Sequence, residues 1–493
     1  MKKLLLLLII PFLSFGQGWE QIFGANQSGS GYYGTYELQV ADGVYIICGG
    51  THFTQCALFG MTPSDICIFK TDTNGDEQWS QTFGEGYWDF GKSIQQASDG
   101  GYVIAGYVNG GIGGGDAYLL KVDENGEEQW SQIFDFGIAE SIQQTTDGGY
   151  IITGYDSSDI HLLKTDENGE QQWSQTFEES FNDRAMFVQQ TTDSGYVITG
   201  YTSVINSLGN AARDIYLLKT DENGEQQWSQ TFEESFNDRA MFVQQTTDSG
   251  YVITGYTSVI NSLGNAARDI YLLKTDENGE QQWSQTFGGP GNDKAHCVQQ
   301  TTDGGYIIIG EDEEDVYNPG NDFWIANSDV YLIKTNELGQ EEWAQRFGEA
   351  GNDCGRSVQQ TSDGGYIIAG YVTPGENQNS NIYLLKTNDT GEEQWSQTFG
   401  GAGDDTAQSV QQTSDGGYII AAHTSTINNI SNGVYLIKTD AQGNTTSTNI
   451  IETPTINKSL IKKIDILGRE TTNKSFQLHI YDDGTVDKKY LIK

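Results

Sequence analysis

A short pattern, Trp-x-Gln-x-Phe or a close variant, recurs along most of this chain. Its tryptophans follow one another about every 54 residues, and they are Trp19, Trp79, Trp130, Trp173, Trp228, Trp283, Trp343 and Trp395. Residues 165–219 and 220–274 are identical copies of one unit. Such a period predicts a chain of repeated supersecondary units that share their cores with their neighbours, and the eight tryptophans are expected to be structural wedges between units.

Each unit contains four strand-like segments, which in one copy are residues 357–361, 366–371, 382–386 and 394–399. Asp-Gly or Asn-Gly turns join the first two segments and the last two, so both pairs are expected to be antiparallel hairpins. The second segment is apolar on both alternating faces, which predicts a sheet covered on both sides. Tandem four-stranded sheets of this kind are typical of a β-propeller.

The number of units follows from the second and third segments, each of which occurs eight times. The last third segment ends at Lys438, and no tryptophan-bearing fourth segment follows it, whereas residues 19–23 have no partner at the N-terminus. We therefore predict an all-β, eight-bladed propeller of four-stranded antiparallel blades that is closed by its N-terminal strand, which removes the last open sheet edge. A stacked β-solenoid is the alternative, although the variable lengths between second and third segments disfavour it.

The two ends of the chain differ from the repeats. Residues 1–16 combine Lys2 and Lys3 with an apolar run and small residues before Gln17, which predicts a secretory signal peptide. That run is too short to span a bilayer, and no later segment of the sequence is long and apolar enough to be a transmembrane segment. Residues 450–493 carry eight basic and six acidic residues, so a domain boundary is predicted before them. The intervening body, 17–449, is the predicted propeller.

The charge of the body limits its partners. It contains 16 basic and 62 acidic residues, and the whole chain has a net charge of −42. A field of this sign repels phosphate backbones and anionic lipid, so no nucleic-acid partner and no anionic membrane-surface partner is expected.

Two segments resemble known families. The tail motifs Lys-Lys-Ile-Asp-Ile-Leu-Gly-Arg-Glu (462–470) and Ile-Tyr-Asp-Asp-Gly-Thr-Val-Asp-Lys-Lys (480–489) resemble the C-terminal sorting domain of type IX secretion substrates in Bacteroidetes. This resemblance implies that residues 450–493 engage the type IX secretion machinery, and that the protein is secreted or held at the outer-membrane cell surface. Residues 272–283 resemble the tryptophan-docking repeat of quinoprotein-like eight-bladed propellers, although the adjacent Cys-Cys pair expected of a quinoprotein dehydrogenase is absent from the sequence.

Candidate ligand-binding residues lie in the connections that vary between units, because variable loops usually carry binding residues. Tyr87 and Trp88 follow the fourth segment of the first unit, and Tyr317, Phe323 and Trp324 lie in the long connection 311–329, predicted as a loop. Exposed aromatic rings beside carboxylates are suited to stacking on sugars or holding a cation. Local packing within the loops is the alternative.

Candidate metal ligands recur between units as Asn-Asp or Asp-Asp pairs. We consider Asp183, Asp238, Asp293, Asp353 and Asp404 as oxygen ligands, with Ca²⁺ as the one cofactor they suggest. Hydrogen bonding of these side chains to their own loop backbone is the competing interpretation. The five histidines occupy different repeat positions, so the sequence predicts no histidine metal cluster.

Five cysteines form an odd set for an exported chain. Cys48 and Cys67 are predicted on neighbouring strands and are the favoured disulfide, with Cys56 as a competitor. Cys297 and Cys354 are expected to be buried thiols.

The favoured function is a secreted or cell-surface binding or adhesion protein whose unknown ligand is a glycan or a protein. The sequence contains no G-x-S-x-G, phosphate-loop or H-E-x-x-H motif, which argues against an enzyme. A hydrolase or lyase acting on extracellular polysaccharide is the alternative, since paired carboxylates would suffice for it. A structural surface-layer component is the third possibility.

Overall fold

The computed structural model describes residues 18–23, 31–33, 38–41, 44–52, 64–84, 89–111, 114–178, 182–205, 211–232, 238–260, 266–318, 323–375, 378–427, 430–445, 460–464, 476–481 and 486–490. The chain divides into two compact units, Met1–Thr446 and Ser447–Lys493. The segment predicted as a signal peptide, 1–16, lies outside the described residues.

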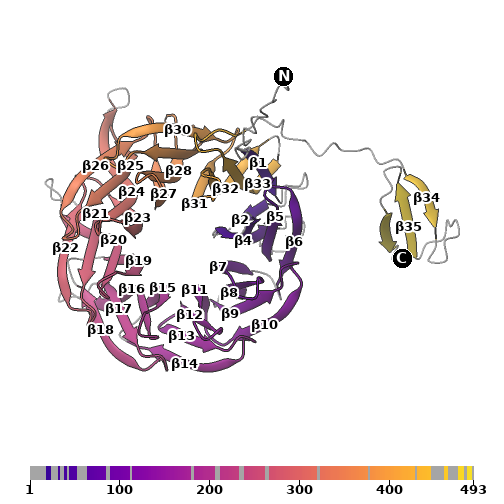
Figure 1. Cartoon of the computed structure of the whole chain (residues 1–493), viewed down its shortest axis with the longest axis horizontal. Helices are drawn as coiled ribbons and strands as arrows, with labels where there is room; N and C mark the ends of the chain where they lie inside the picture. The colour runs from indigo at the N-terminus through magenta and orange to yellow at the C-terminus, as the bar shows by residue number, and fades with distance from the viewer. Residues whose placement is uncertain are drawn as a thin grey trace, which may run out of the picture. The chain divides into compact units, whose positions relative to one another are not determined.

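The first unit is a ring of eight antiparallel sheets, or blades (Figure 1). The first strand of each blade lies nearest the centre of the ring and the fourth lies at its periphery (Figure 1). The described part of the chain contains strands and no helix. The predicted eight-bladed propeller is therefore confirmed.

The strand bounds follow the predicted repeat. Blade 1 comprises β2 (Gly31–Tyr33), β3 (Leu38–Ala41), β4 (Val44–His52), β5 (Ile66–Thr71) and β6 (Glu77–Phe83), and blade 2 comprises β7 (Phe90–Gln96), β8 (Tyr102–Gly111), β9 (Gly114–Val122) and β10 (Glu128–Phe134). Blade 3 comprises β11 (Ile138–Gln144), β12 (Tyr150–Tyr155), β13 (Ile160–Thr165) and β14 (Gln171–Phe177). Blade 4 comprises β15 (Arg184–Gln190), β16 (Tyr196–Ile205), β17 (Ala211–Thr220) and β18 (Gln226–Phe232). Blade 5 comprises β19 (Arg239–Gln245), β20 (Tyr251–Ile260), β21 (Ala266–Thr275) and β22 (Gln281–Phe287), and blade 6 comprises β23 (Lys294–Gln300), β24 (Tyr306–Asn318), β25 (Phe323–Thr335) and β26 (Glu341–Phe347). Blade 7 comprises β27 (Cys354–Gln360), β28 (Tyr366–Val372), β29 (Asn381–Thr387) and β30 (Glu393–Phe399). Blade 8 comprises β31 (Asp405–Gln412), β32 (Tyr418–Ile427), β33 (Ile430–Thr439) and β1 (Trp19–Phe23). Blade 1 has an additional short strand, because β2 and β3 both pair with β4.

The N-terminal strand closes the ring, as predicted. β1 pairs antiparallel with β33 from Trp19↔Lys438 to Phe23↔Val434. Trp19 and Phe23 are buried against Tyr45 and Phe69 of blade 1, so one short strand joins the last blade to the first.

The core lies between blades, which explains why the second and third strands are apolar on both faces. Val197 and Leu217 of blade 4, for example, pack with Val243 and Ile253 of blade 5 and are all fully buried. Each sheet thus contributes one face to the preceding joint and the other to the next joint.

The two ends of the ring differ. We call the end formed by the short turns between first and second strands, and between third and fourth strands, the turn rim. The opposite end, where second and third strands connect, is the hairpin rim. Hairpins there range from the six-residue strands β12 and β13 to the thirteen-residue strands β24 and β25.

The connection 311–329, predicted as a loop, is instead mostly paired strand. β24 and β25 remain in register to Asn318↔Phe323, so the hairpin of blade 6 continues beyond the length shared by the other blades.

The second unit contains one three-stranded antiparallel sheet. Its strands are β34 (Leu460–Ile464), β35 (Phe476–Tyr481) and β36 (Val486–Tyr490), paired in sequence order. Within the described residues of the whole chain, we find no helix with the length and apolarity needed to cross a bilayer.

The predicted disulfide between Cys48 and Cys67 is not formed. Cys48 lies opposite Ile68 and Cys67 lies opposite Gly49 on the paired strands β4 and β5. Because neighbouring residues alternate between sheet faces, the two thiols point into different cores. The competitor, Cys56, lies outside the described residues.

Candidate functional site

The repeated tryptophans lie at the joints between blades. Each indole contacts the positive-φ glycine in the next blade's turn between third and fourth strands. At Gly339 (φ +73°), a Cβ would come within 2.4 Å of the Trp283 ring, so only glycine fits beneath it. The Trp19 and Trp79 indole nitrogens donate to the carbonyl oxygens of Thr73 and Glu124, both at 3.0 Å. These contacts account for the tryptophan pattern without any ligand.

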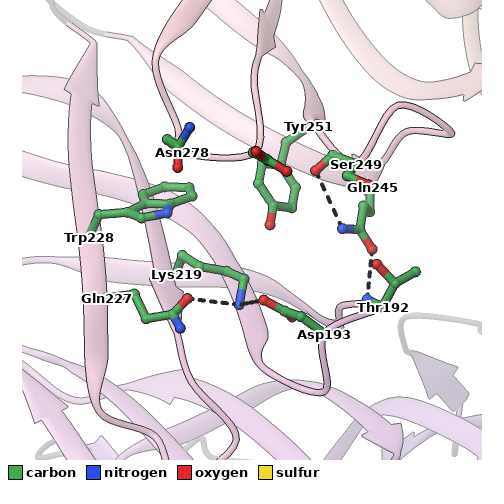
Figure 2. Close-up of a pocket in the computed structure, with 10 residues that line it drawn as sticks. Thr192, Asp193, Lys219, Gln227, Trp228, Gln245, Ser249, Tyr251 and Asn278 are labelled. Carbon is green, nitrogen blue, oxygen red and sulfur yellow. Dashed lines mark hydrogen bonds and ion pairs between the residues drawn. The ribbon is translucent and has the colours of Figure 1, made fainter.

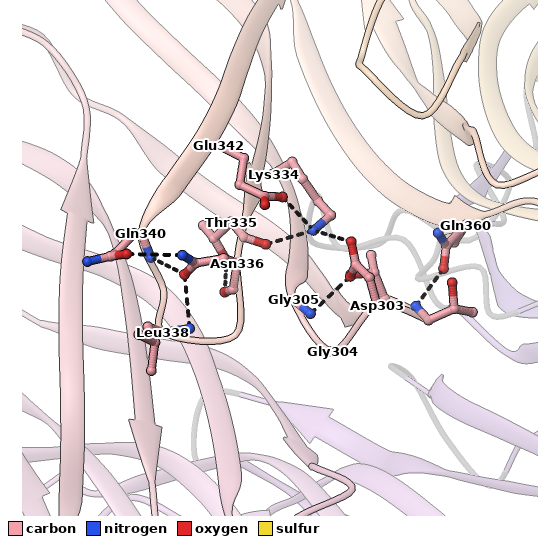
Figure 3. Close-up of polar contacts among 12 residues, drawn as sticks. Asp303, Gly304, Gly305, Lys334, Thr335, Asn336, Leu338, Gln340, Glu342 and Gln360 are labelled. Carbon is pink, nitrogen blue, oxygen red and sulfur yellow. Dashed lines mark hydrogen bonds and ion pairs between the residues drawn. The ribbon is translucent and has the colours of Figure 1, made fainter.

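In blades 2 to 8, a buried lysine at the end of the third strand ties the two turns of the blade together, as Figure 3 shows for blade 6. Lys334 has only 4% of its side chain exposed; it forms an ion pair with Asp303 at 3.0 Å and donates to the carbonyl of Thr335 at 2.7 Å. Burial alone would raise the pKa of Asp303, but hydrogen bonds from Thr301 and Lys334 hold it below its usual value. The same pairs are Lys121–Asp99, Lys164–Asp147, Lys219–Asp193, Lys274–Asp248, Lys386–Asp363 and Lys438–Asp415.

A pair of glutamines at the end of the innermost strand in blades 2 to 8 joins neighbouring blades. The Gln299 side-chain oxygen accepts from the Gln360 backbone N–H, and the Gln360 side-chain oxygen accepts from the Thr302 backbone N–H, both at 2.9 Å. Between blades 4 and 5, Gln245 bonds Thr192 in a groove of about 550 Å³ beside Trp228 (Figure 2). Since these groove residues largely bond one another, their repetition is structural.

The predicted calcium ligands hold the loops between blades. Asp183, Asp238, Asp293 and Asp353 are all 0% exposed, and their carboxylates accept bonds from hairpin residues of their own blade, as in Thr202 to Asp183 at 2.7 Å. Asp404 is exposed; its neighbour Asp405 occupies the equivalent buried position. In the described part of the chain these aspartates form no three-residue ligand cluster, so the calcium site stays a prediction.

Blade 6 departs from this arrangement. Asp312 replaces the threonine that faces the loop aspartate in blades 4 and 5, and the two buried carboxyls hydrogen-bond each other. Burial, followed by this bond, raises the pKa of Asp293 to about 8. The Arg346 guanidinium forms an ion pair with Asp312 on its other side. Because both carboxyls are at most 1% exposed, this pair is not open to a polysaccharide chain.

The innermost strands carry the residues that do not repeat. In blades 2 to 8, the register between the first and second strands shifts at the third residue of the first strand, or at the fourth in blade 8, consistent with a β-bulge at that position. Bulges re-aim side chains and are frequent beside binding sites. The residues concerned, which we call the bulge ring, are Lys92, Glu140, Met186, Met241, His296, Arg356 and Gln408.

The bulge ring surrounds a cavity of about 690 Å³ in the central channel, and six of its seven residues line that cavity. Apolar side chains lie on one side of the ring, where the tilted rings of Phe187 and Phe242 are in contact with their centroids 4.8 Å apart. Charged side chains lie elsewhere: Lys92 forms an ion pair with Glu140 at 3.3 Å. The cavity thus combines apolar and charged walls, as ligand sites usually do.

The basic residues of this acidic body divide evenly between its two ends, but those at the turn rim are engaged in structural contacts. Seven of the 16 body lysines and arginines are the buried turn-rim lysines, and Lys70 bonds the Glu124 carbonyl at the next joint. The other eight lie on strand segments near the hairpin rim: Lys92, Arg184, Arg213, Arg239, Arg268, Lys294, Arg346 and Arg356. Five of these are on innermost strands around the channel. The innermost strands around the channel therefore carry five basic and two acidic side chains, the acidic ones being Glu140 and Asp405.

Three metal-ligating side chains meet at the joint between blades 6 and 7. One potential ligand atom each of His296, Glu311 and Cys354 lies within 4.8 Å of the others. Burial, and then nearby Arg356, lowers the pKa of His296 to about 4; burial raises the pKa of Cys354 to about 12. Histidine spacing along the chain does not reveal this cluster, because its three residues lie far apart in sequence. Position-by-position comparison of the repeats would have revealed it.

The predicted aromatic residues are only partly placed. Tyr87 and Trp88 lie outside the described residues. Tyr317 and Trp324 are backbone partners near the end of the blade 6 hairpin, with Phe323 beside them, but their side chains lie outside the described part of the structure.

Comparisons with known proteins identify the scaffold. The family model described as outer membrane protein assembly factor BamB matches residues 67–318. Among solved structures, the Dos1 propeller has 9% identity and a TM-score of 0.50 over 88% of this chain and 97% of that chain. Sqt1 from Chaetomium thermophilum has 10% identity and a TM-score of 0.46 over 82% and 96%. These similarities concern the fold alone. No curated protein matches the chain.

Proposed function

Because this chain belongs to the family of the outer membrane protein assembly factor BamB, we propose that it is an exported propeller that binds a ligand in its channel and catalyses no reaction. The bulge ring carries this proposal. Elsewhere the repeat keeps the same residues because they build the joints, whereas the ring differs from blade to blade around a cavity of about 690 Å³.

The charges favour an anionic ligand. Lys92 and Arg356 line the cavity, and Arg184, Arg239 and Lys294 lie on the same innermost strands nearer the hairpin rim. The acidic turn rim repels an anion only weakly here, because screening at physiological ionic strength limits exposed charges to about 8 Å. With the Phe187–Phe242 pair as an apolar platform, an acidic extracellular glycan is the ligand class we favour.

A glycan array of acidic and neutral polysaccharide fragments tests this function with the purified full-length protein. We expect binding to uronic or sulfated fragments, with at least tenfold weaker binding by Arg356→Gln, since a charge-assisted bond contributes about 1.5–3 kcal/mol. Arg346→Gln is the matched control, because Arg346 lies on the outermost strand β26. Absence of acidic-glycan binding, or equal loss in both variants, would refute the channel site.

We further propose that residues 450–493 direct export through type IX secretion, on the strength of the tail motifs. The β-sheet of the second unit provides a folded element for recognition. In a host with this machinery, the full chain should reach the cell surface or medium. A chain ending at residue 449 should remain in the periplasm, and export of that truncated chain to the surface would contradict the proposal.

The family match supports a second candidate, a periplasmic role in assembling outer-membrane proteins. BamB is by its description an assembly factor of that kind. This candidate predicts copurification with outer-membrane assembly proteins and no release to the surface. The two candidates therefore differ in location and in partner.

A further inference from the structure

We propose that His296, Glu311 and Cys354 form a site for a divalent transition-metal ion, with Zn²⁺ as the ion that suits them best. The site joins blades 6 and 7 and is distinct in chemistry from the glycan site proposed above. The three ligand atoms lie within 4.8 Å of one another and comprise an imidazole nitrogen, a carboxylate oxygen and a sulfur. Zinc accepts all three donor types in proteins.

The other joints provide an internal comparison. The three positions are the bulge-ring residue, the second-strand residue that pairs with the start of its own first strand, and the first residue of the next blade. Between blades 3 and 4, and between blades 4 and 5, these positions hold Glu140, Tyr155 and Arg184, and Met186, Tyr201 and Arg239. In those joints the arginine lies over the tyrosine ring, at 4.6 and 4.5 Å. Only between blades 6 and 7, among the described joints, do all three positions carry metal-ligating groups within reach of each other.

One buried polar atom of this cluster lacks a partner, as a metal ligand would in the absence of its ion. The Nε2 atom of His296 is buried and has no hydrogen-bond partner. Cys354 is 0% exposed; its thiol lies 3.7 Å from the Gly355 carbonyl and also hydrogen-bonds the Glu311 carboxylate, so these two proposed ligands are already in contact. A buried polar nitrogen without a partner is unfavourable, and ligation after a turn of the imidazole would satisfy the ring.

The geometry requires a small adjustment. Ligands on a tetrahedral zinc are separated by roughly 3.3–3.8 Å, given bond lengths of about 2.0–2.3 Å. Side-chain rotation can close the difference from 4.8 Å, because Cys354 and His296 lie on adjacent innermost strands. His296 also lines the channel cavity, so a fourth position is available to water from that side.

Two cations oppose the metal and provide a specific test. Lys294 forms an ion pair with Glu311 through one carboxylate oxygen, and Arg356 Nη1 lies 3.5 Å from His296 Nδ1. Binding releases the Cys354 proton, so Zn²⁺, one thiolate and one carboxylate sum to zero charge. Arg356 must then turn toward Tyr371, over whose ring it already lies at 5.9 Å.

Cobalt titration of the full-length protein, stripped of metal by a chelator, tests the proposal. We expect one equivalent of Co²⁺ to produce a thiolate-to-cobalt charge-transfer band that Zn²⁺ abolishes. Cys354→Ser should eliminate the band, and Glu311→Tyr, which restores the repeat's residue, should weaken binding at least as much as the ~10–100-fold lost with outer-shell partners. Cys297→Ser and His423→Tyr are matched controls, and both should retain the band.

Arg356→Gln separates a metal site from a merely structural cluster. Removing this cation should tighten Co²⁺ binding by about tenfold, the equivalent of 1.4 kcal/mol. If the three side chains serve only to pack the joint, the same substitution should not increase the affinity for Co²⁺. The proposal is overturned if the folded wild-type protein gives no thiolate band, if the band survives Cys354→Ser, or if Arg356→Gln leaves the affinity unchanged. Thermal unfolding of each variant establishes that it is folded.

Discussion

Removal of the Trp19 indole tests whether one strand holds the ring closed. Trp19 is 6% exposed, packs edge-on against Tyr45 and donates a 3.0 Å hydrogen bond to Thr73 in blade 1. Truncating a buried tryptophan to alanine costs about 3–5 kcal/mol, and the lost hydrogen bond adds about 1 kcal/mol. Trp19→Ala should therefore lower the free energy of unfolding by about 4–6 kcal/mol, a large fraction of the 5–15 kcal/mol typical of a domain.

Trp228→Ala is the matched comparison, since Trp228 makes the same type of contact within the continuous part of the ring. Its indole lies 5.8 Å from Tyr251 and contacts Gly279, but it is only half-buried. We expect about half the loss, about 2–3 kcal/mol. Urea unfolding followed by circular dichroism measures both variants. If Trp19→Ala costs no more than Trp228→Ala, the closing strand does not have the role that its burial indicates.

Three further perturbations address the joints and blade 6. Burial and Asp312 raise the pKa of Asp293 to about 8, so the stability contributed by this carboxyl is full below about pH 4 and is lost as the pH rises towards 8. The Asp312→Thr variant should therefore lose less thermal stability between pH 5 and pH 9 than the wild-type protein does. An equal loss in the two proteins would contradict the assignment. Gly339→Ala should lower the free energy of unfolding by about 2–4 kcal/mol and Gly304→Ala by about 1 kcal/mol, because both glycines have positive φ but only Gly339 lies beneath a tryptophan. In thermal melts, Gly339→Ala should therefore have the lower melting temperature of the two variants. Hydrogen bonds from Thr301 and Lys334 hold the pKa of Asp303 below its usual value against burial, so Asp303→Asn should destabilise the protein at pH 7 and progressively less as the pH falls through that lowered pKa; a pH-independent effect would exclude the ion pair as the cause.

The architecture was predictable because it depends on the number of repeated strand segments in the sequence. Eight copies of the second and third strands, together with an unpaired segment at residues 19–23, define both the blade number and the closing strand. The alternation of apolar residues also identified sheets covered on both faces. The cysteine pairing failed because neighbouring strands were known but their register was not, and a shift of one residue places Cys48 and Cys67 on opposite faces.

The candidate sites were less predictable because they depend on a local shift in register. A bulge near the start of the innermost strand in blades 2 to 8 sets the ring around the cavity, and no residue type in the sequence marks it. The loop aspartates show the complementary difficulty: their recurrence is compatible with metal binding and with loop bonding alike, and burial of residues such as Asp353 favours the latter. Glu311 and Cys354 are distant in sequence, and only the packing of blade 6 on blade 7 brings them together.

The pairing of β1 with β33 also determines when the molecule can be complete. Trp19 emerges from the ribosome among the earliest residues of the body, whereas its partner Lys438 is synthesised among the last. The first strand must therefore wait through the synthesis of every other blade, and any interrupted chain retains an exposed edge that proteases and chaperones can recognise. The ring can therefore close only after translation of the body has reached its end.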